Sequence, residues 1–153
     1  MLIEVKARVA WIIDTKVKRR LETFILDREV FAEAEYAVMT LLSGNVNDGT
    51  VESYEILGMK VSQVKEIVTQ YQGENTYVAS LRDTFLQNDG TEKIVRYKVL
   101  LWANNISDAM TNTRGIASQG YDMQIDGLRE VNYTYLNTQR NEETAENENP
   151  SEN

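Results

Sequence analysis

The sequence predicts an α+β fold made of two tandem ββαβ units, with antiparallel sheet packed by two helices. Three observations predict it. Apolar and charged residues alternate over the first 13 residues, as in a half-buried strand. Polar turn sequences separate apolar runs of strand length. The segment 99–115, VLLWANNISDAMTNTRG, repeats the pattern of segment 24–39, FILDREVFAEAEYAVM: a strand-like run, a polar break and a helical stretch.

The first unit starts with a hairpin that pairs residues 3–13 with residues 19–26 across DTKVK. A helix follows, and Gly44 is expected to end it. The stretch TVESYEILGMKVSQVKEIV is then strand-like, with a break expected at Gly58. The helix is predicted from one apolar stripe at helical spacing, formed by Phe31, Ala34, Val38, Leu41 and Leu42.

The second unit repeats this plan. Residues 77–86 and 92–102 flank QNDGT, and an Asp-Gly pair suits a tight hairpin turn. Asn105 and Asp108 are expected to cap a helix that Gly115 interrupts. YDMQIDGLREVNYTYL forms the last strand or pair of strands. The helix is predicted from Ile106, Ala109, Met110 and Ala117.

Aligning Ala34 with Ala109 superposes the two halves at an offset of 75 residues, with Leu26 on Leu101. The units then cover about residues 1–70 and 71–136 of one folded domain, 1–136. Internal duplication explains this echo. The alternative is convergence, because hairpin–helix–strand is a common order of elements.

The segment 137–153 has five Glu, one Arg, the only proline of the chain and one Ala as its only apolar residue. Such a segment buries too little apolar surface to offset the entropy of ordering it. We therefore expect a disordered acidic tail. It either contacts a protein partner or serves solubility alone.

Cysteine and histidine are both absent from the 153 residues. Their absence removes thiolate nucleophiles, disulfides, the commonest general base and the commonest transition-metal ligands. We therefore expect a protein that is not an enzyme and that holds no cofactor or metal. The chain also lacks an apolar run of the ~20 residues that a membrane span needs, and its N-terminus lacks a signal-peptide layout. A cytoplasmic protein without membrane contact is expected, in the host cytoplasm if a phage encodes it.

The net charge is −8, shared equally between the tail and residues 1–136. An acidic body argues against binding duplex DNA through a large basic face. Several strands are apolar on both sides, which indicates that each is covered twice. With two helices available, homo-oligomerisation is expected to supply the second cover.

Basic residues gather on two hairpin arms: Lys16, Lys18, Arg19 and Arg20 at the tip of the first, and Lys93, Arg96 and Lys98 on the second. With Trp11 and Trp102 nearby, these arms could form a groove for single-stranded nucleic acid, because cations contact phosphates and rings stack on bases. The alternative is that the cations protect exposed strand edges and the aromatic rings belong to the core.

Weaker patterns point elsewhere. Asp122, Asp126 and Glu130 recur every four residues, and Glu4 with Lys6 has the Glu-x-Lys spacing of some nuclease cores. Tyr133 and Tyr135 share one face of the last strand, where they either stack on a nucleotide or simply cover the sheet.

The order of these elements, and above all LDREVFAEAE and YDMQIDGL, resembles an uncharacterised family of about this length found in Bacteroidetes genomes and their phages. The resemblance covers nearly the whole folded part. It implies a phage or mobile-element setting and transfers no site residue.

The function expected from the sequence is non-catalytic binding of single-stranded nucleic acid, single-stranded DNA foremost, in phage or mobile-element replication or repair. The alternative is a homo-oligomeric interaction protein, either a virion component or an inhibitor of host defence that binds a host protein or a nucleotide signal. A metal-dependent nuclease is a third possibility.

Overall fold

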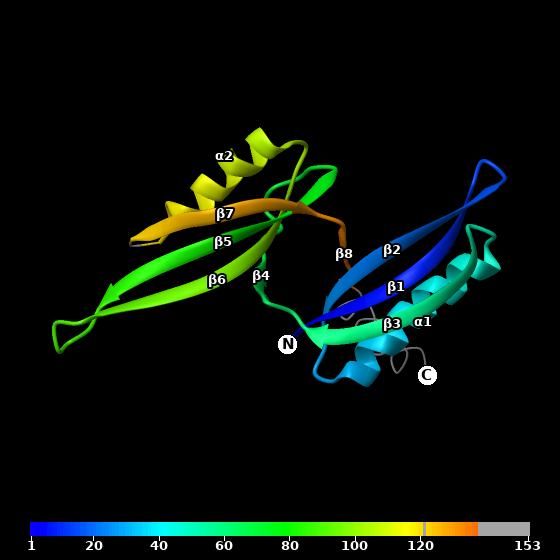
Figure 1. The fold of residues 1–153 in the computed structure, drawn as a ribbon, viewed down its shortest axis with the longest axis horizontal. Helices are drawn as coiled ribbons and strands as arrows, with labels where there is room; N and C mark the ends of the chain where they lie inside the picture. Colours follow the sequence, from blue (N-terminus) through cyan, green and yellow to red (C-terminus); the bar gives the residue numbers. More distant parts are fainter. Residues whose placement is uncertain (121, 138–153) are drawn as a thin grey trace, which may run out of the picture. The chain divides into compact units, whose positions relative to one another are not determined.

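The computed structural model describes residues 1–120 and 122–137, and the chain divides into two compact units (Figure 1). Unit 1 contains residues 1–62 together with residues 133–137. Unit 2 contains residues 63–132. The described residues 133–137 thus belong to the first unit, although they follow unit 2 in the sequence. The predicted acidic tail lies outside the described residues, except for Asn137.

Unit 1 is a four-stranded sheet in the order β3-β1-β2-β8. Both β2 and β3 pair with β1 in antiparallel fashion, and the short β8 runs parallel to β2. Helix α1 packs on one face of this sheet. The elements are β1 (Leu2–Ile13), β2 (Lys16–Asp27), α1 (Phe31–Asn47), β3 (Val51–Val61) and β8 (Tyr133–Tyr135).

Unit 2 has the same plan, in the order β4-β6-β5-β7. Both β6 and β7 pair with β5 in antiparallel fashion, the short β4 runs parallel to β6, and α2 covers one face. The predicted pair of ββαβ units is therefore confirmed. The elements are β4 (Val64–Ile67), β5 (Asn75–Leu86), β6 (Glu92–Ala103), α2 (Ile106–Ala117) and β7 (Met123–Val131).

The two short strands are exchanged between the units. β4 follows β3 of unit 1 along the chain but pairs with unit 2, whereas β8 follows β7 of unit 2 but pairs with unit 1. Each of these two short strands is followed by a buried apolar residue. The backbone N–H of that residue donates to the second strand of the hairpin in the same unit, which is β6 in unit 2 and β2 in unit 1. Val68 donates to the Leu100 carbonyl at 2.8 Å, and Leu136 donates to the Ile25 carbonyl at 2.9 Å. The two acceptors are 75 residues apart in the sequence.

The two cores follow the same offset. Leu26 and Leu101 are fully buried on equivalent strands, and Ala34 and Ala109 are fully buried in the helices. Helix α1 begins at residue 31 and α2 at residue 106. Small alanine side chains at these points let each helix approach its sheet closely. The Asn105 cap is confirmed, because its side chain accepts the Asp108 N–H at 2.9 Å.

The predicted five-residue turn of the first hairpin is wrong. The turn consists of Asp14 and Thr15 alone, and the strand resumes at Lys16. Both turn residues have positive φ, 51° and 67°. This left-handed pair matches the right-handed twist of the hairpin strands. The basic residues expected at the hairpin tip therefore lie along β2 instead.

Three glycines were predicted to interrupt or end helices and strands, and this prediction is wrong for all three. Helix α1 runs through Gly44, α2 through Gly115 and β3 through Gly58. A glycine inside a helix costs only about 1 kcal/mol relative to alanine, which packing of the neighbouring residues offsets. The predicted stripe also changes, because Phe31 and Leu41 are exposed. The buried residues of α1 are Ala34, Ala37, Val38 and Leu42.

One tetrapeptide, NDGT, occurs twice, as residues 47–50 after α1 and as residues 88–91 between β5 and β6. In each copy the glycine has a positive φ, 82° at Gly49 and 87° at Gly90. In each copy the aspartate Oδ1 accepts both the N–H and the hydroxyl of the threonine two residues later. The same local structure thus ends a helix in one unit and closes a hairpin in the other.

These contacts lower the pKa of Asp89, because the Thr91 hydroxyl and then the Thr91 N–H donate to its charged form. A pKa lowered by folding adds stability above the unfolded pKa of about 3.9, and that stability is lost as pH falls through the folded pKa. We expect Thr91→Val to raise the pKa of Asp89, measured by an NMR titration of the carboxyl carbon. Asp48, whose contacts with Thr50 are unchanged, is the internal control. An unchanged Asp89 pKa would contradict this account.

Candidate nucleic-acid interface

Each sheet has one face covered by its helix and one face turned away from it, here called the open face. Strand alternation assigns residues to these faces. In unit 2, Tyr77, Ala79 and Leu81 of β5 belong to the core under α2. The residues between and after them, Val78, Ser80 and Arg82, therefore lie on the open face, together with their partners across β6 and β7.

A β-bulge occurs at the same place in both sheets. The pairing of β1 with β3 shifts after Lys6, and the pairing of β5 with β7 shifts after Ser80. The extra residues are Leu57 and Asp126, each followed by a glycine and preceded by an isoleucine. The glycines, Gly58 and Gly127, lie opposite Lys6 and Ser80. The bulges therefore mark equivalent positions on the two open faces.

Four basic residues form what we call the cationic patch on the open face of unit 2. Arg82 of β5 lies directly opposite Arg96 of β6, and Lys98 follows Arg96 on the same face. Lys65 of β4 lines a hollow of about 380 Å³ together with Arg96 and Lys98. The patch therefore unites two residues predicted from the sequence with Lys65 and Arg82, which were not predicted.

The cationic patch is only partly neutralised. Arg82 lies 3.4 Å from the Asp126 carboxylate and also donates to Gln124. The Lys98 ammonium group donates to the neutral Gln63 side chain at 3.0 Å. Arg96 has no ion-pair partner among the residues that the structure describes. Because like charges directly across two strands repel each other, the Arg82–Arg96 pair favours an anion between them.

This distribution contrasts with the charge of unit 2 as a whole. Residues 63–132 include nine acidic and seven basic residues. Four of the seven bases form the cationic patch, where Asp126 is the acidic residue that lines the same hollow. An acidic unit thus has a locally positive face, which attracts anions to that face.

Unit 1 has a smaller cationic site on its own open face. Arg8 of β1 and Arg19 of β2 line a hollow of about 250 Å³. Arg8 is paired with Glu55 of β3, with 3.2 Å between the charged groups. Arg19 therefore has the less compensated charge of the two.

The remaining predicted cations lie on the other faces of their strands. Lys16, Lys18 and Arg20 are exposed on the helix side of β2, as their pairing with Ile13, Trp11 and Val9 shows. Lys93 lies opposite Phe85 and is likewise on the helix side of its sheet. Each arm thus divides its cations between two faces.

The two predicted tryptophans differ in position. Trp11 packs against the core of unit 1, and its indole N–H donates to Glu22 at 2.7 Å. Trp102 is half-buried on the open face of unit 2, the same face as Arg96 and Lys98. Leu100, which is buried, separates it from Lys98. The cationic patch therefore lies on the hairpin side of Leu100, and Trp102 lies on the other side.

Tyr97, between the two patch cations, faces the helix side and contacts the Met123 sulfur with its hydroxyl at 3.3 Å. Burial raises the pKa of this phenol, and the negative charges of Asp83 and Glu66 raise it further. Tyr97 is therefore a neutral hydroxyl donor at neutral pH.

The predicted carboxylate sets do not converge. In the part of the chain that the structure describes, no three acidic side chains are grouped so that they could hold a metal ion. Asp126 is paired with Arg82, and Glu4 accepts a hydrogen bond from Ser62. None of the described helices is both long and apolar enough to cross a membrane.

Residues 3–137 match a protein family described as a domain of unknown function (DUF4494). The chain belongs to this family. No curated protein and no solved structure matches the chain.

A sequence signal could have identified Arg82. Its position two residues after Ser80 and four after Val78 follows the same alternation that groups Arg96 with Lys98. Lys65 had no such signal, because β4 reaches this sheet through a parallel pairing with a distant strand.

Proposed function

We propose that this family member binds single-stranded nucleic acid without altering it chemically, and that the cationic patch contacts the phosphates. The observation that supports the proposal is the pairing of Arg82 with Arg96 across two strands, beside Lys98 and Lys65. An array of this kind neutralises successive phosphates along a strand. We assign the activity to replication or repair of a phage or mobile element.

A sheet face with cations on neighbouring strands suits a flexible single strand better than a duplex, because a single strand can follow the surface. The chain as a whole is acidic, so binding is confined to one narrow track. Trp102, on the same face, could add stacking of one base, worth about 1–3 kcal/mol.

The test is the fluorescence anisotropy of a labelled oligo(dT) at salt concentrations between about 50 and 200 mM. Affinity is expected to fall with salt. Replacing Arg96 or Lys98 by alanine should weaken binding and reduce the log–log salt slope by about 0.7 for each phosphate that the variant no longer neutralises. The matched control is Arg114→Ala, which removes an exposed arginine of the same unit from helix α2. Affinity and slope should be unchanged there.

Equal weakening by Arg96→Ala and Arg114→Ala would show a general charge effect and contradict the proposed interface. Absence of binding at low salt would contradict the function itself. The alternative, a homo-oligomeric interaction protein, would then be favoured by the exposed apolar side chains near the β5–β6 turn, Phe85, Leu86 and Ile94.

A further inference from the structure

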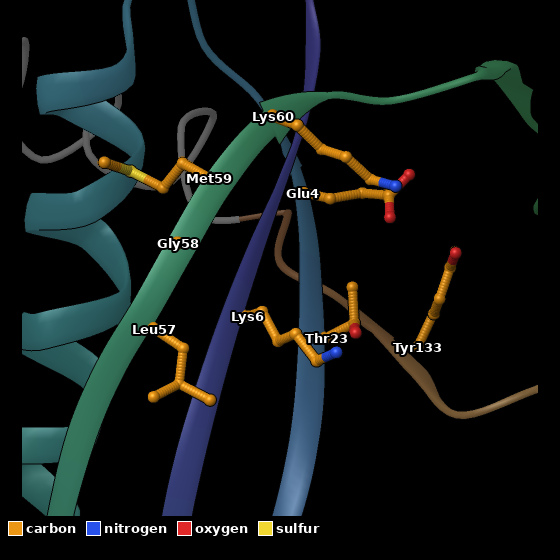
Figure 2. Close-up of a pocket in the computed structure, with 8 residues that line it drawn as sticks. All are labelled: Glu4, Lys6, Thr23, Leu57, Gly58, Met59, Lys60 and Tyr133. Atoms are coloured by element: carbon orange, nitrogen blue, oxygen red, sulfur yellow. The ribbon is translucent and has the colours of Figure 1, made fainter.

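Unit 1 contains a pocket of about 420 Å³ on its open face (Figure 2). One row of side chains crosses all four strands there: Gly58 of β3 lies opposite Lys6 of β1, Lys6 opposite Thr23 of β2, and Thr23 opposite Tyr133 of β8. Because Gly58 has no side chain, the row is hollow at one end. The volume is within the range of about 300–1,000 Å³ typical of small-molecule sites.

A nearly buried carboxylate lies in the next row of the sheet. Glu4 is 7% exposed and lines the pocket. Its Oε2 accepts the Ser62 hydroxyl at 2.6 Å. Among the described residues, every fully buried side-chain oxygen has a hydrogen-bond partner. Oε1 of Glu4 has no hydrogen-bond partner among these residues. Oε1 is therefore accessible to solvent, and the pocket is the space that Glu4 lines. Oε1 is therefore available to a ligand, and Oε2, which accepts one hydrogen bond from Ser62, can accept a second one.

Two ammonium groups are near this acceptor. Lys60 lies directly opposite Glu4 across β3 and β1, and Lys6 follows Glu4 by two residues on β1, on the same face of the sheet. Figure 2 shows Lys60 extending from β3 toward Glu4, with Lys6 on the same side of the sheet. The pocket therefore combines two positive charges with one carboxylate. A ligand that fits needs an anionic group and N–H donors.

We propose that this pocket binds a guanine nucleotide, with the base at Glu4 and the phosphate at Lys6 and Lys60. Guanine has two adjacent N–H donors, N1–H and the exocyclic amino group, which match the two oxygens of a carboxylate. Adenine and cytosine offer an amino group beside an acceptor nitrogen, which a carboxylate repels. Thymine and uracil offer one N–H between two carbonyl oxygens. A carboxylate at the base position therefore selects guanine.

This site goes beyond the proposed function and does not depend on it. It belongs to unit 1 and takes a single nucleotide, whereas the cationic patch belongs to unit 2 and contacts a strand of any sequence. The two pockets occupy equivalent bulges of duplicated sheets, but Leu57 in unit 1 replaces the charged Asp126 of unit 2. Failure of oligo(dT) binding and failure of guanine binding are thus separate results.

The experiment is calorimetric titration of the full chain with GMP, AMP, CMP and UMP at low salt. GMP is expected to bind at least about tenfold more tightly than the other three, the usual gain from a good bidentate contact. Glu4→Gln should remove that preference. Gly58→Val should abolish GMP binding, because the added side chain fills the hollow. The variant should still fold, because a Cβ at Gly58 meets no atom within 4 Å and displaces no neighbour.

Ser53→Val is the matched control, since it adds valine to the same strand and face outside the pocket. It should leave GMP affinity unchanged, and circular-dichroism melts should show that all variants fold. The source of the guanine is decided by comparing oligo(dT) with and without one central guanine. Tighter binding of the guanine strand, abolished by Gly58→Val, assigns the site to a base within a strand. Binding of GMP alone assigns it to a free nucleotide.

Three results would overturn the proposal: no saturable GMP binding, equal affinity for all four nucleotides, or GMP binding that persists in Gly58→Val.

Discussion

Replacing Leu101 by alanine is expected to destabilise unit 2 by about 3 kcal/mol, within the range measured for fully buried leucines. Leu101 is 0% exposed and packs in the core between β5, β6 and α2. Leu26 has the equivalent position in unit 1 and is also 0% exposed. Leu26→Ala should therefore destabilise unit 1 by a similar amount. The cost arises from apolar packing that alanine cannot make and from the cavity that remains.

The chain offers a separate optical probe for each unit, because its two tryptophans are Trp11 in unit 1 and Trp102 in unit 2. Urea unfolding of Trp11→Phe and Trp102→Phe backgrounds reports one unit at a time. Leu101→Ala should shift the transition reported by Trp102 more than that reported by Trp11, and Leu26→Ala should do the reverse. Equal shifts of the transitions reported by Trp11 and Trp102 would show that the two units unfold together in one cooperative step. A shift below about 1 kcal/mol would contradict the assigned core position.

Gly73→Ala is expected to destabilise unit 2 by about 1–3 kcal/mol, the usual cost of forcing an extra group into a packed site. A Cβ on Gly73 would clash with the carbonyl carbon and the Cα of Ala103. Backbone atoms at the end of β6 cannot rotate away as a side chain can. The neighbouring residue, Glu74, is held to the same segment by its N–H, which donates to Asn104 at 3.1 Å.

Two other glycines provide the comparison for Gly73→Ala. At Gly115 a Cβ would meet the Tyr71 hydroxyl at 2.5 Å, the end of a movable side chain. At Gly58 it would meet no atom within 4 Å. The destabilisation measured by urea unfolding should therefore decrease from Gly73→Ala through Gly115→Ala to Gly58→Ala. A Gly73→Ala protein as stable as Gly58→Ala would contradict the close approach to Ala103.

Local patterns in the sequence predicted much of the fold correctly. The turn of the second hairpin and the Asn105 cap depend on residues within a few positions of each other, and Ala34 and Ala109 have the same position because each half repeats the same local order of elements. The prediction that Gly44 ends the first helix was wrong. Gly44 has no local feature that requires a stop, and the helix continues to the NDGT turn, where Gly49 adopts a positive φ.

The cationic patch was only half predictable. Arg96 and Lys98 share a face because strand side chains alternate, which the sequence shows directly. Arg82 and Lys65 join them through pairings of β5 and β4 with β6. The same alternation places Lys93, Lys16, Lys18 and Arg20 on other faces, once the turn of the first hairpin is known to be two residues long.

The sequence by itself determined the two ββαβ units, the second hairpin and the Asn105 cap. These features depend on backbone sterics and hydrogen bonds within a few residues. Only the tertiary structure decided that β8 joins unit 1, that β4 joins unit 2, and that Gly58, Lys6, Thr23 and Tyr133 form one row. Strand partners are chosen by the burial of apolar faces from distant segments, such as Leu136 beside Leu26. No short-range pattern encodes that choice.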